Sequence, residues 1–322
     1  MNSKEKYDVI CVGAALIDMI AEVKRHPSED DEVFVSNLTM RSGGAAANTA
    51  ATCGRLGLKT AFLGKLGLED EFGNKIKKDF IEMYVSTELI KYSEKFSTGS
   101  AYVALNNEGD RRIYAHSGAA NYLSDTDIRE SEISISKLIF LSSLKNIKPF
   151  IKAATIANRL GIPVILNPGM LIIEQGINKI TSLLKTIDLL ILSEREYKLL
   201  VEISNDAGIY EIFKSSKEIF DLGIKYLIIT MGSEGAMVLD VSNYEKIDPE
   251  RVKNVVDTTG AGDAFSAGFI YAYMHSGNFN FKTTVKNAKM GNYIASQVIQ
   301  KLGARSEIPS KKEVQEYFQN IK

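Results

Sequence analysis

Short apolar runs alternate with longer segments of helical periodicity through most of this sequence, and this alternation restricts the fold more than any other feature. The runs expected to form buried strands are residues 7–12, 60–64, 137–141, 163–167, 189–193 and 226–230. The helices expected around them are residues 45–56, 72–84, 149–160, 177–185 and 194–201. Near-continuous apolar strands separated by helices indicate an α/β fold, with a parallel sheet covered on both faces.

Two stretches interrupt this pattern. Residues 18–38 carry the charged string SEDDE between alternating ends, which predicts a pair of short strands. Residues 100–116 have strand-like runs on both sides of Asn-Asn-Glu-Gly-Asp, a sequence typical of a hairpin turn. We therefore expect a small sheet that projects from the main domain. The expected division is an α/β domain of residues 1–14, 39–98 and 119–322, with residues 15–38 and 99–118 in the small sheet.

Composition excludes several classes of protein. The net charge of the 322 residues is −1, so no overall field attracts nucleic acid or an anionic membrane. No apolar run approaches the ~18 residues of a membrane span, and the N-terminus lacks the layout of a signal peptide. Cys11 and Cys53 lie in apolar surroundings and are expected as buried thiols. These features indicate a cytoplasmic enzyme or binding protein.

The most informative motif is DTTGAGDAF, which begins at Asp257. Its small residues lead into a helical run at Asp263, and a loop at a helix N-terminus presents unpaired N–H groups at the positive end of the helix dipole. Such a loop could hold a phosphoryl group during transfer. Asp263 could accept the proton of an attacking hydroxyl group. A capped turn would explain an isolated Gly-x-Gly-Asp, but the nine-residue string is more specific.

Two further motifs could bind a polyol. In SGGAAANTA, Gly43 and Gly44 allow another group to approach the backbone, and Asn48 lies in the first turns of the following helix. In GAALID, Asp18 follows the first strand, near the sheet edge where ligands of open α/β sheets bind. Tight packing of helix on sheet would explain the first motif as well, and a turn aspartate would explain the second.

Motifs of other enzyme classes are absent from the sequence. Gly13 is not followed by the dinucleotide pattern Gly-x-Gly-x-x-Gly, and there is no Gly-x4-Gly-Lys-Ser/Thr loop. A Gly-x-Ser-x-Gly elbow is also missing. His26, His116 and His275 have no second His or Cys at metal-ligand spacing, so a transition metal held by protein ligands is not expected. A kinase built on this chain would need another phosphate-binding loop, and DTTGAGD is the candidate.

Six motifs, in this order, resemble those of the ribokinase-like family, the PfkB carbohydrate kinases, over essentially the whole chain. They are GAALID, SGGAAANTA, GKLGLEDEFG, TMGSEGA, DTTGAGDAF and a closing helix followed by Gly303-Ala304. The resemblance implies a ribokinase-like three-layer α/β/α sandwich with a β-sheet lid that closes over the sugar. It also implies ATP as phosphoryl donor, bound with Mg²⁺, and often K⁺ as a monovalent cation. The lid often pairs in dimers, so a homodimer through the lid is open to this chain.

The resemblance also implies roles for individual residues. The position of Asp263 is that of the catalytic base, and those of Gly260, Ala261 and Gly262 form the anion hole. The positions of Asp18, Gly43, Gly44 and Asn48 bind the sugar, and those of Thr230, Gly232, Gly235 and Asn292 surround the nucleotide. Glu196 is expected to act on Mg²⁺ through its water shell, and Asp257 to lie near the monovalent cation.

Three departures from the family pattern limit these implications. Ser193 stands where the usual Asn-x-x-Glu motif has asparagine. GKLGLEDEFG is one residue longer than usual, so either Glu69 or Asp70 takes its acidic position. Leu16 stands where ribokinases proper carry asparagine, and Ala14 replaces the glutamate of fructokinases, so ribose specificity is not implied.

We therefore expect an ATP-dependent kinase that transfers the γ-phosphoryl group to a primary hydroxyl of a small, fructose- or ribose-like sugar. A nucleoside kinase of the same family is one alternative, with Phe34, Tyr102 and Tyr114 available to contact a base. A sugar-binding regulator on a non-catalytic kinase scaffold is another, although the intact Asp263 argues against it.

Overall fold

The computed structural model describes residues 6–108 and 110–321. This range leaves out residues 1–5 and 322 of the expected α/β domain and Gly109 of the expected hairpin turn. Within the described residues, nine strands form one sheet in the order β15-β14-β13-β12-β11-β10-β1-β4-β6. Strands β6 through β13 in this order pair in parallel, and β14 and β15 are antiparallel.

The strands of this sheet are β1 (Val9–Gly13), β4 (Thr60–Leu63), β6 (Val85–Ser86), β10 (Ile139–Ser142), β11 (Val164–Asn167), β12 (Leu189–Ser193), β13 (Tyr226–Thr230), β14 (Ala236–Leu239) and β15 (Tyr244–Ile247). The apolar runs of the sequence correspond to β1, β4, β10, β11, β12 and β13, which confirms the expected parallel sheet. These six strands are buried almost throughout, which explains why their sequences are continuously apolar rather than alternating.

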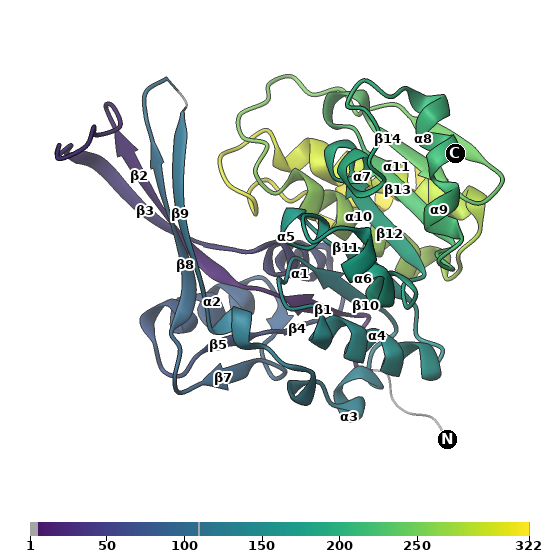
Figure 1. Ribbon diagram of the computed structural model, residues 1–322, viewed down its shortest axis with the longest axis horizontal. Coiled ribbons are helices and arrows are strands. Elements are labelled where there is room, and N and C mark those ends of the chain that lie inside the picture. The colour runs from purple at the N-terminus through teal and green to yellow at the C-terminus, as the bar shows by residue number, and fades with distance from the viewer. Residues whose placement is uncertain (1–5, 109, 322) are drawn as a thin grey trace.

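Helices cover both faces of the sheet (Figure 1). One face packs against α1 (Ala45–Leu56), α2 (Glu71–Glu82), α10 (Ala261–Ser276), α11 (Phe281–Val298) and α12 (Lys311–Asn320). The other packs against α3 (Glu130–Ile133), α4 (Lys148–Arg159), α5 (Met170–Ile173), α6 (Ile177–Leu184), α7 (Glu194–Leu200), α8 (Ile209–Ser215) and α9 (Lys217–Phe220). Val9 and Cys11 of β1 face the first group, whereas Ile10 and Val12 face the second. The expected three-layer α/β/α sandwich is confirmed.

A second, four-stranded sheet reaches away from the sandwich (Figure 1). Its strands, in the order β3-β2-β8-β9, are β2 (Leu16–Val23), β3 (Val35–Gly43), β8 (Thr98–Leu105) and β9 (Arg111–Gly118). We call it the lid sheet. The turn of the β8–β9 hairpin is held by Asn106, whose side-chain oxygen accepts hydrogen bonds from the N–H groups of Glu108 and Asp110. β3 extends beyond residue 38, into the range that the sequence assigns to the α/β domain.

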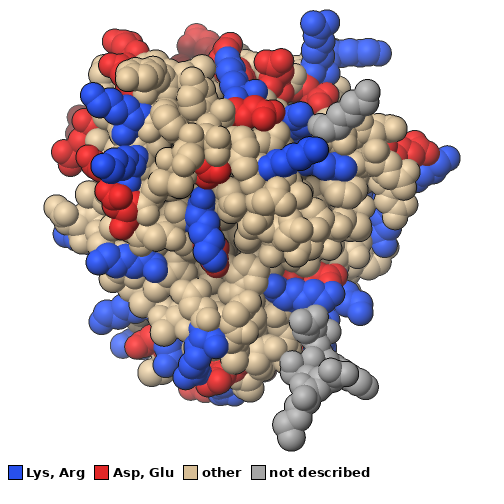
Figure 2. All heavy atoms as spheres, turned by 90° about the vertical axis from the view of Figure 1, so that its right-hand side faces the viewer, with Lys and Arg blue, Asp and Glu red and all other residues tan. Residues whose placement is uncertain are grey.

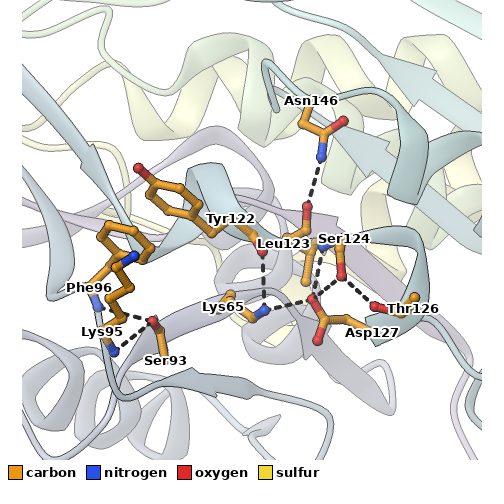
Figure 3. A network of polar contacts seen from close by, with 10 residues as sticks. All are labelled: Lys65, Ser93, Lys95, Phe96, Tyr122, Leu123, Ser124, Thr126, Asp127 and Asn146. Atoms are coloured by element: carbon orange, nitrogen blue, oxygen red, sulfur yellow. Dashed lines mark hydrogen bonds and ion pairs between the residues drawn. The ribbon is translucent and has the colours of Figure 1, made fainter.

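Polar contacts fasten the root of the lid sheet to the sandwich (Figure 3). A short parallel pair, β5 (Lys65–Gly67) and β7 (Lys91–Ser93), lies there. Lys65 donates from Nζ to the Asp127 carboxylate at 2.7 Å and to the Tyr122 carbonyl at 3.1 Å. The ring of Tyr122, just after β9, stacks on Phe96, just before β8, with centroids 3.6 Å apart. Both ends of the hairpin are therefore tied together and to the body.

Of the two acidic residues between which the sequence left the choice open, Asp70 is the one that makes structural hydrogen bonds. Its Oδ1 accepts a hydrogen bond from the Gly73 N–H and so caps the start of α2. Its Oδ2 accepts from the N–H of Thr98, the first residue of β8. Glu69 is exposed instead, with a left-handed φ of 56°.

Charges of both signs are mixed on the face of the molecule shown in Figure 2. None of the helices in the described ranges is both long and apolar enough to cross a membrane.

Candidate active site

The N-terminus of α10 forms the centre of the candidate site. The helix begins at Ala261 after Gly260, whose left-handed φ of 79° reverses the chain from the preceding loop. A side chain at Gly260 would also bring its Cβ within 2.4 Å of the Ala304 Cβ, so glycine is required there for two reasons. Gly262 has open space beside its Cα. The first N–H groups of α10 thus face a place where an anion could approach.

Asp263 lies in the first turn of α10 and is tied to a distant helix. Its Oδ2 accepts a hydrogen bond from Nδ2 of Asn48, on α1, at 2.8 Å. Burial raises the pKa of Asp263 to about 7, against the opposing effects of the Asn48 hydrogen bond and the positive charge of Arg305. The charge of Glu196 acts in the same direction as burial. A carboxylate poised near neutrality is suited to general base catalysis.

The two glycines before α1 allow the lid sheet to approach this helix. Gly44 has a φ of 97°, and a Cβ on it would lie 2.5 Å from the Ala14 carbonyl oxygen. A Cβ on Gly43 would lie 2.2 Å from Oδ2 of Asp18. The sequence therefore places Gly43 where a carboxylate passes close to the backbone.

Asp18 lies on β2 of the lid sheet, paired with Arg41 of β3 and Ala101 of β8. Burial raises its pKa above the usual range, and the positive charge of Arg305 opposes that rise. The same guanidinium therefore influences both Asp18 and Asp263. The structure brings together Asp18, Gly43, Asn48 and Asp263, which the sequence singled out from motifs far apart in the chain.

Arg305 belongs to this site, although no sequence motif predicts it. Its Nε donates to Oδ1 of Asn48 at 2.9 Å, and its guanidinium lies 5.7 Å from the centre of the Phe80 ring. Its position directly after the Gly303-Ala304 stop was the one available signal, and arginines after a helix are usually exposed.

A cavity of about 560 Å³ adjoins the N-terminus of α10. Its walls include all four residues that the sequence assigned to the nucleotide: Thr230, Gly232, Gly235 and Asn292. Ala261 and Gly262 of the anion loop line the same cavity, so it opens onto the place that an anion could occupy. Gly232 and Gly235, with φ of 57° and 87°, form the turn between β13 and β14 that shapes one wall.

Glu196 is part of a capping box at the start of α7. Its Oε2 accepts hydrogen bonds from the N–H and the hydroxyl of Ser193, each at 2.8 Å. Ser193 therefore caps α7, as an asparagine at this position also could. The carboxylate is held near the site, where its charge affects Asp263.

Asp257 lies at the start of the anion loop and is satisfied by backbone groups. Oδ1 accepts from the Thr259 N–H and Oδ2 from the Gly303 N–H, both at 2.9 Å. Burial would raise its pKa, but these hydrogen bonds outweigh burial and hold the pKa below the usual range. Arg111 of β9 lies 3.9 Å away. Among the described residues, no group of three or more His, Cys, Asp or Glu side chains could hold a metal ion.

Comparison with known proteins shows a consistent similarity. The sequence profile described as pfkB family carbohydrate kinase matches residues 6–311. The chain is 27% identical to the ribokinase of Mus musculus, over 97% of this chain and 95% of that protein. It is 28% identical to the probable chloroplastic fructokinase-6 of Arabidopsis thaliana, over 84% and 71% of the two chains. The solved structure of Arabidopsis thaliana ribokinase complexed with ribose and ATP superposes with a TM-score of 0.85 at 26% identity, over 97% and 99% of the chains.

Proposed function

Because the chain belongs to the pfkB family of carbohydrate kinases, we propose that it transfers the γ-phosphoryl group of ATP to a primary hydroxyl of a small, fructose- or ribose-like sugar. Membership makes it a phosphotransferase with an alcohol group as acceptor. The choice of ATP is supported by the solved ribokinase that holds ribose and ATP. The choice of sugar class is supported by the similarity to both a ribokinase and a fructokinase.

The placement of Asp263 is the observation that carries the proposal. It is the first carboxylate after the anion loop and is partly buried, with a pKa raised to about 7. The sugar hydroxyl would give its proton to Asp263 as its oxygen bonds to the γ-phosphorus, and the bond from that phosphorus to the β–γ bridging oxygen would break, releasing ADP. The N–H groups of residues 260–262 would stabilise the charge on the phosphoryl oxygens.

The sugar would bind between the lid sheet and α1. Asp18 can accept two hydrogen bonds from neighbouring hydroxyls, and Gly43 and Gly44 leave room for the sugar beside the backbone. Asn48 would contact the sugar from α1. ATP would occupy the cavity that Thr230, Gly232, Gly235 and Asn292 line, with its phosphates directed to Gly262.

Mg²⁺ would enter with ATP rather than bind to the protein alone. The described carboxylates offer no cluster that could chelate it, which fits an ion held by phosphates, water and a single carboxylate. Glu196 has Oε2 fixed by Ser193, so its other oxygen would be available to a metal-bound water. When bound, the ion neutralises charge on the phosphates.

We also propose a monovalent cation, K⁺, beside Asp257. The support is a carboxylate that stays charged and is anchored to both the anion loop and Gly303. Arg111 already offsets part of this charge, so we expect a modest activation. At fixed ionic strength, potassium should raise the rate above that in sodium. Equal rates in potassium, sodium and tetramethylammonium would show that no monovalent cation site contributes to activity.

A nucleoside acceptor is less well supported by the strand register. Tyr102 pairs with Met19 and Tyr114, whereas Asp18 pairs with Arg41 and Ala101. Side chains alternate between the two faces of a sheet, so both tyrosines lie on the face opposite Asp18. Phe34 precedes β3 and is 86% exposed. The register therefore does not favour stacking of either tyrosine on a base held by Asp18.

A panel of sugars and nucleosides, assayed for ADP release with ATP and Mg²⁺, tests the proposal. We expect turnover with a ketohexose or pentose and little with nucleosides. A nucleoside used at least tenfold more efficiently than any sugar would overturn the substrate class. Binding of sugar without turnover, with Asp263 intact, would indicate a regulator instead of an enzyme.

A further inference from the structure

The burial of Arg305 in the candidate site is unfavourable for the stability of the folded protein. It lies in the segment between α11 and α12, and both of its Nη atoms are buried. Within residues 6–108 and 110–321, neither Nη atom has a hydrogen-bond partner. A buried donor without an acceptor destabilises a folded protein, because it has lost its hydrogen bonds to water and gained none in return. Structural stabilisation alone therefore does not explain this guanidinium.

A chain of two hydrogen bonds connects Arg305 to Asp263. Nε of Arg305 donates to Oδ1 of Asn48 at 2.9 Å, and Nδ2 of Asn48 donates to Oδ2 of Asp263 at 2.8 Å. A guanidinium can only donate hydrogen bonds, so it can pair only with the oxygen of the asparagine amide. The amide's N–H end is thereby directed at Asp263. In the reversed orientation, the amide oxygen would face the carboxylate and repel it.

We propose that Arg305 is a positioning residue for phosphoryl transfer, because it fixes the amide of Asn48 so that Asn48 holds Asp263 in place as a carboxylate. The inference rests on the proposed function of Asp263 as the base. It assigns no contact between Arg305 and the substrate.

The charges around Asp263 come from several elements. Asn48 on α1 and Arg305 both lower its pKa, whereas Glu196 on α7 raises it. Loss of Arg305 would remove one lowering effect and release the amide that supplies the other. The pKa of Asp263 should therefore rise above about 7, and less of the base would be ionised at neutral pH.

The charges of three carboxylates act on Arg305. Burial lowers its pKa to about 10, and the charges of Asp79, Asp263 and Asp18 oppose that lowering. Asp79, on α2, also accepts a hydrogen bond from Ser42 and pairs with Lys75. Arg305 therefore remains protonated at neutral pH, and its charge persists over the range in which Asp263 titrates.

The test is the pKa of Asp263, measured by NMR on protein with ¹³C-labelled aspartate carboxyls and assigned with Asp263→Asn. In Arg305→Met we expect an increase of roughly one unit, which is a tenfold change in proton affinity. The acid limb of the kcat profile should move up equally, and kcat at pH 7 should fall about fivefold with the KM for ATP unchanged, because the ionised fraction of the base falls from about one half to about one eleventh. Arg305→Lys keeps the charge and one donor, so it should restore most of both values.

The matched control is Arg41→Met. Nη1 of Arg41 donates to the carbonyl of Leu302 at 2.9 Å, so this change loosens the same segment without touching Asn48. We expect the pKa of Asp263 to stay as in the wild type. An unshifted pKa in Arg305→Met, or an equal shift in Arg41→Met, would overturn the role of Arg305. Should Arg305→Met not fold, Arg305→Gln replaces it, since it also removes the charge.

The NMR titration requires no turnover, which separates this inference from the proposed function. A wild-type protein that phosphorylates no acceptor would overturn the proposed function. An Asp263 carboxyl that does not respond to Arg305 would overturn the positioning role, whatever the enzyme phosphorylates.

Discussion

Asp263 is subject to opposing electrostatic effects at the N-terminus of α10. Burial raises its pKa to about 7, and Asn48 and Arg305 limit that rise. A base must be ionised, so kcat should increase with pH and level off above about 7.

The variant Asp263→Asn tests the role of this carboxylate directly. It keeps the volume of the side chain but cannot take a proton, so kcat should fall at least ~10²-fold. A coupled ADP assay measures this, and calorimetry should show nearly unchanged ATP binding. Activity within threefold of wild type would refute the assignment.

The same carboxyl should make stability depend on pH. Its folded pKa of about 7 exceeds the usual value of 3.8, so the folded protein binds the proton more tightly than the unfolded chain. This contribution is fully present below about pH 4 and is lost as the pH rises through about 7. Asp263→Asn is neutral throughout, so its Tm relative to wild type should increase by a few degrees between pH 5 and pH 8. Parallel Tm curves for the two proteins would contradict this.

Asp18 should affect the sugar and not the nucleotide. Asp18→Ala removes hydrogen bonds to a charged acceptor, worth roughly 1.5–3 kcal/mol each. The sugar KM should therefore rise more than tenfold, since about 1.4 kcal/mol is one factor of ten. The KM for ATP should hold, because the nucleotide cavity is lined by residues of the C-terminal half. An unchanged sugar KM with a lower Tm would show that Asp18 serves only the lid strand.

Residues in compact motifs could be predicted from the sequence, and residues defined by distant contacts could not. Asp263 and Asn48 each lie in a run of small residues whose spacing indicates a loop before a helix. Arg305 reaches Asn48 across 257 positions of sequence, and no local pattern encodes that contact. The sequence motif indicates Glu196, whose charge acts on Asp263, but its capping box with Ser193 becomes evident only in the structure.

At the scale of elements, the start of α10 offers a matched pair of glycines. Gly260→Ala would force a φ of 79° on an L-residue and push a Cβ to within 2.4 Å of Ala304. We expect a loss of stability of a few kcal/mol, visible in urea unfolding, because strain and a displaced backbone add together. Activity should fall with it, since Ala304 precedes Arg305.

Gly262→Ala should separate function from stability. Gly262 is inside the helix, its φ is not left-handed, and its Cβ would meet no atom within 4 Å. Alanine favours the helix by up to ~1 kcal/mol, so stability should hold or increase. The methyl group would enter the space proposed for the phosphoryl group, and kcat should fall at least tenfold. A fully active Gly262→Ala would place the phosphoryl group elsewhere.

The elements that could be predicted from the sequence are those buried on both sides. The six apolar runs form strands because most of their residues are buried, and α1 matches its expected range of 45–56. β15 is not predictable in this way, since Tyr244, Glu245 and Lys246 are exposed and only its pairing with β14 makes it a strand. β2 and β3 are longer than the pattern indicates, because a projecting sheet leaves many of their residues exposed.

In the whole molecule, the candidate site lies where the lid sheet meets the sandwich. Asp18 comes from the lid sheet, whereas Asn48, Asp263 and Arg305 come from the body. Arg41 of β3 contacts the Leu302 carbonyl and so joins the two parts beside the site. These contacts form between segments remote in sequence, which explains why motifs identified the participants but not their arrangement.

One face of the lid sheet exposes apolar side chains to solvent. Leu38, Met40 and Tyr114 are 52%, 46% and 68% exposed, and the register places them on the face opposite Asp18. Exposed apolar side chains gathered on one face are typical of an interaction surface. We expect a homodimer through this face, with a mass near twice 35.6 kDa by light scattering.

The double variant Met40→Glu with Tyr114→Glu tests this interface and should yield monomers, because burying unpaired carboxylates is unfavourable. Tyr210→Glu is the control, since Tyr210 on α8 is 73% exposed and lies outside the lid sheet. A wild type that remains monomeric at tens of micromolar, or a double variant that remains dimeric, would exclude this interface.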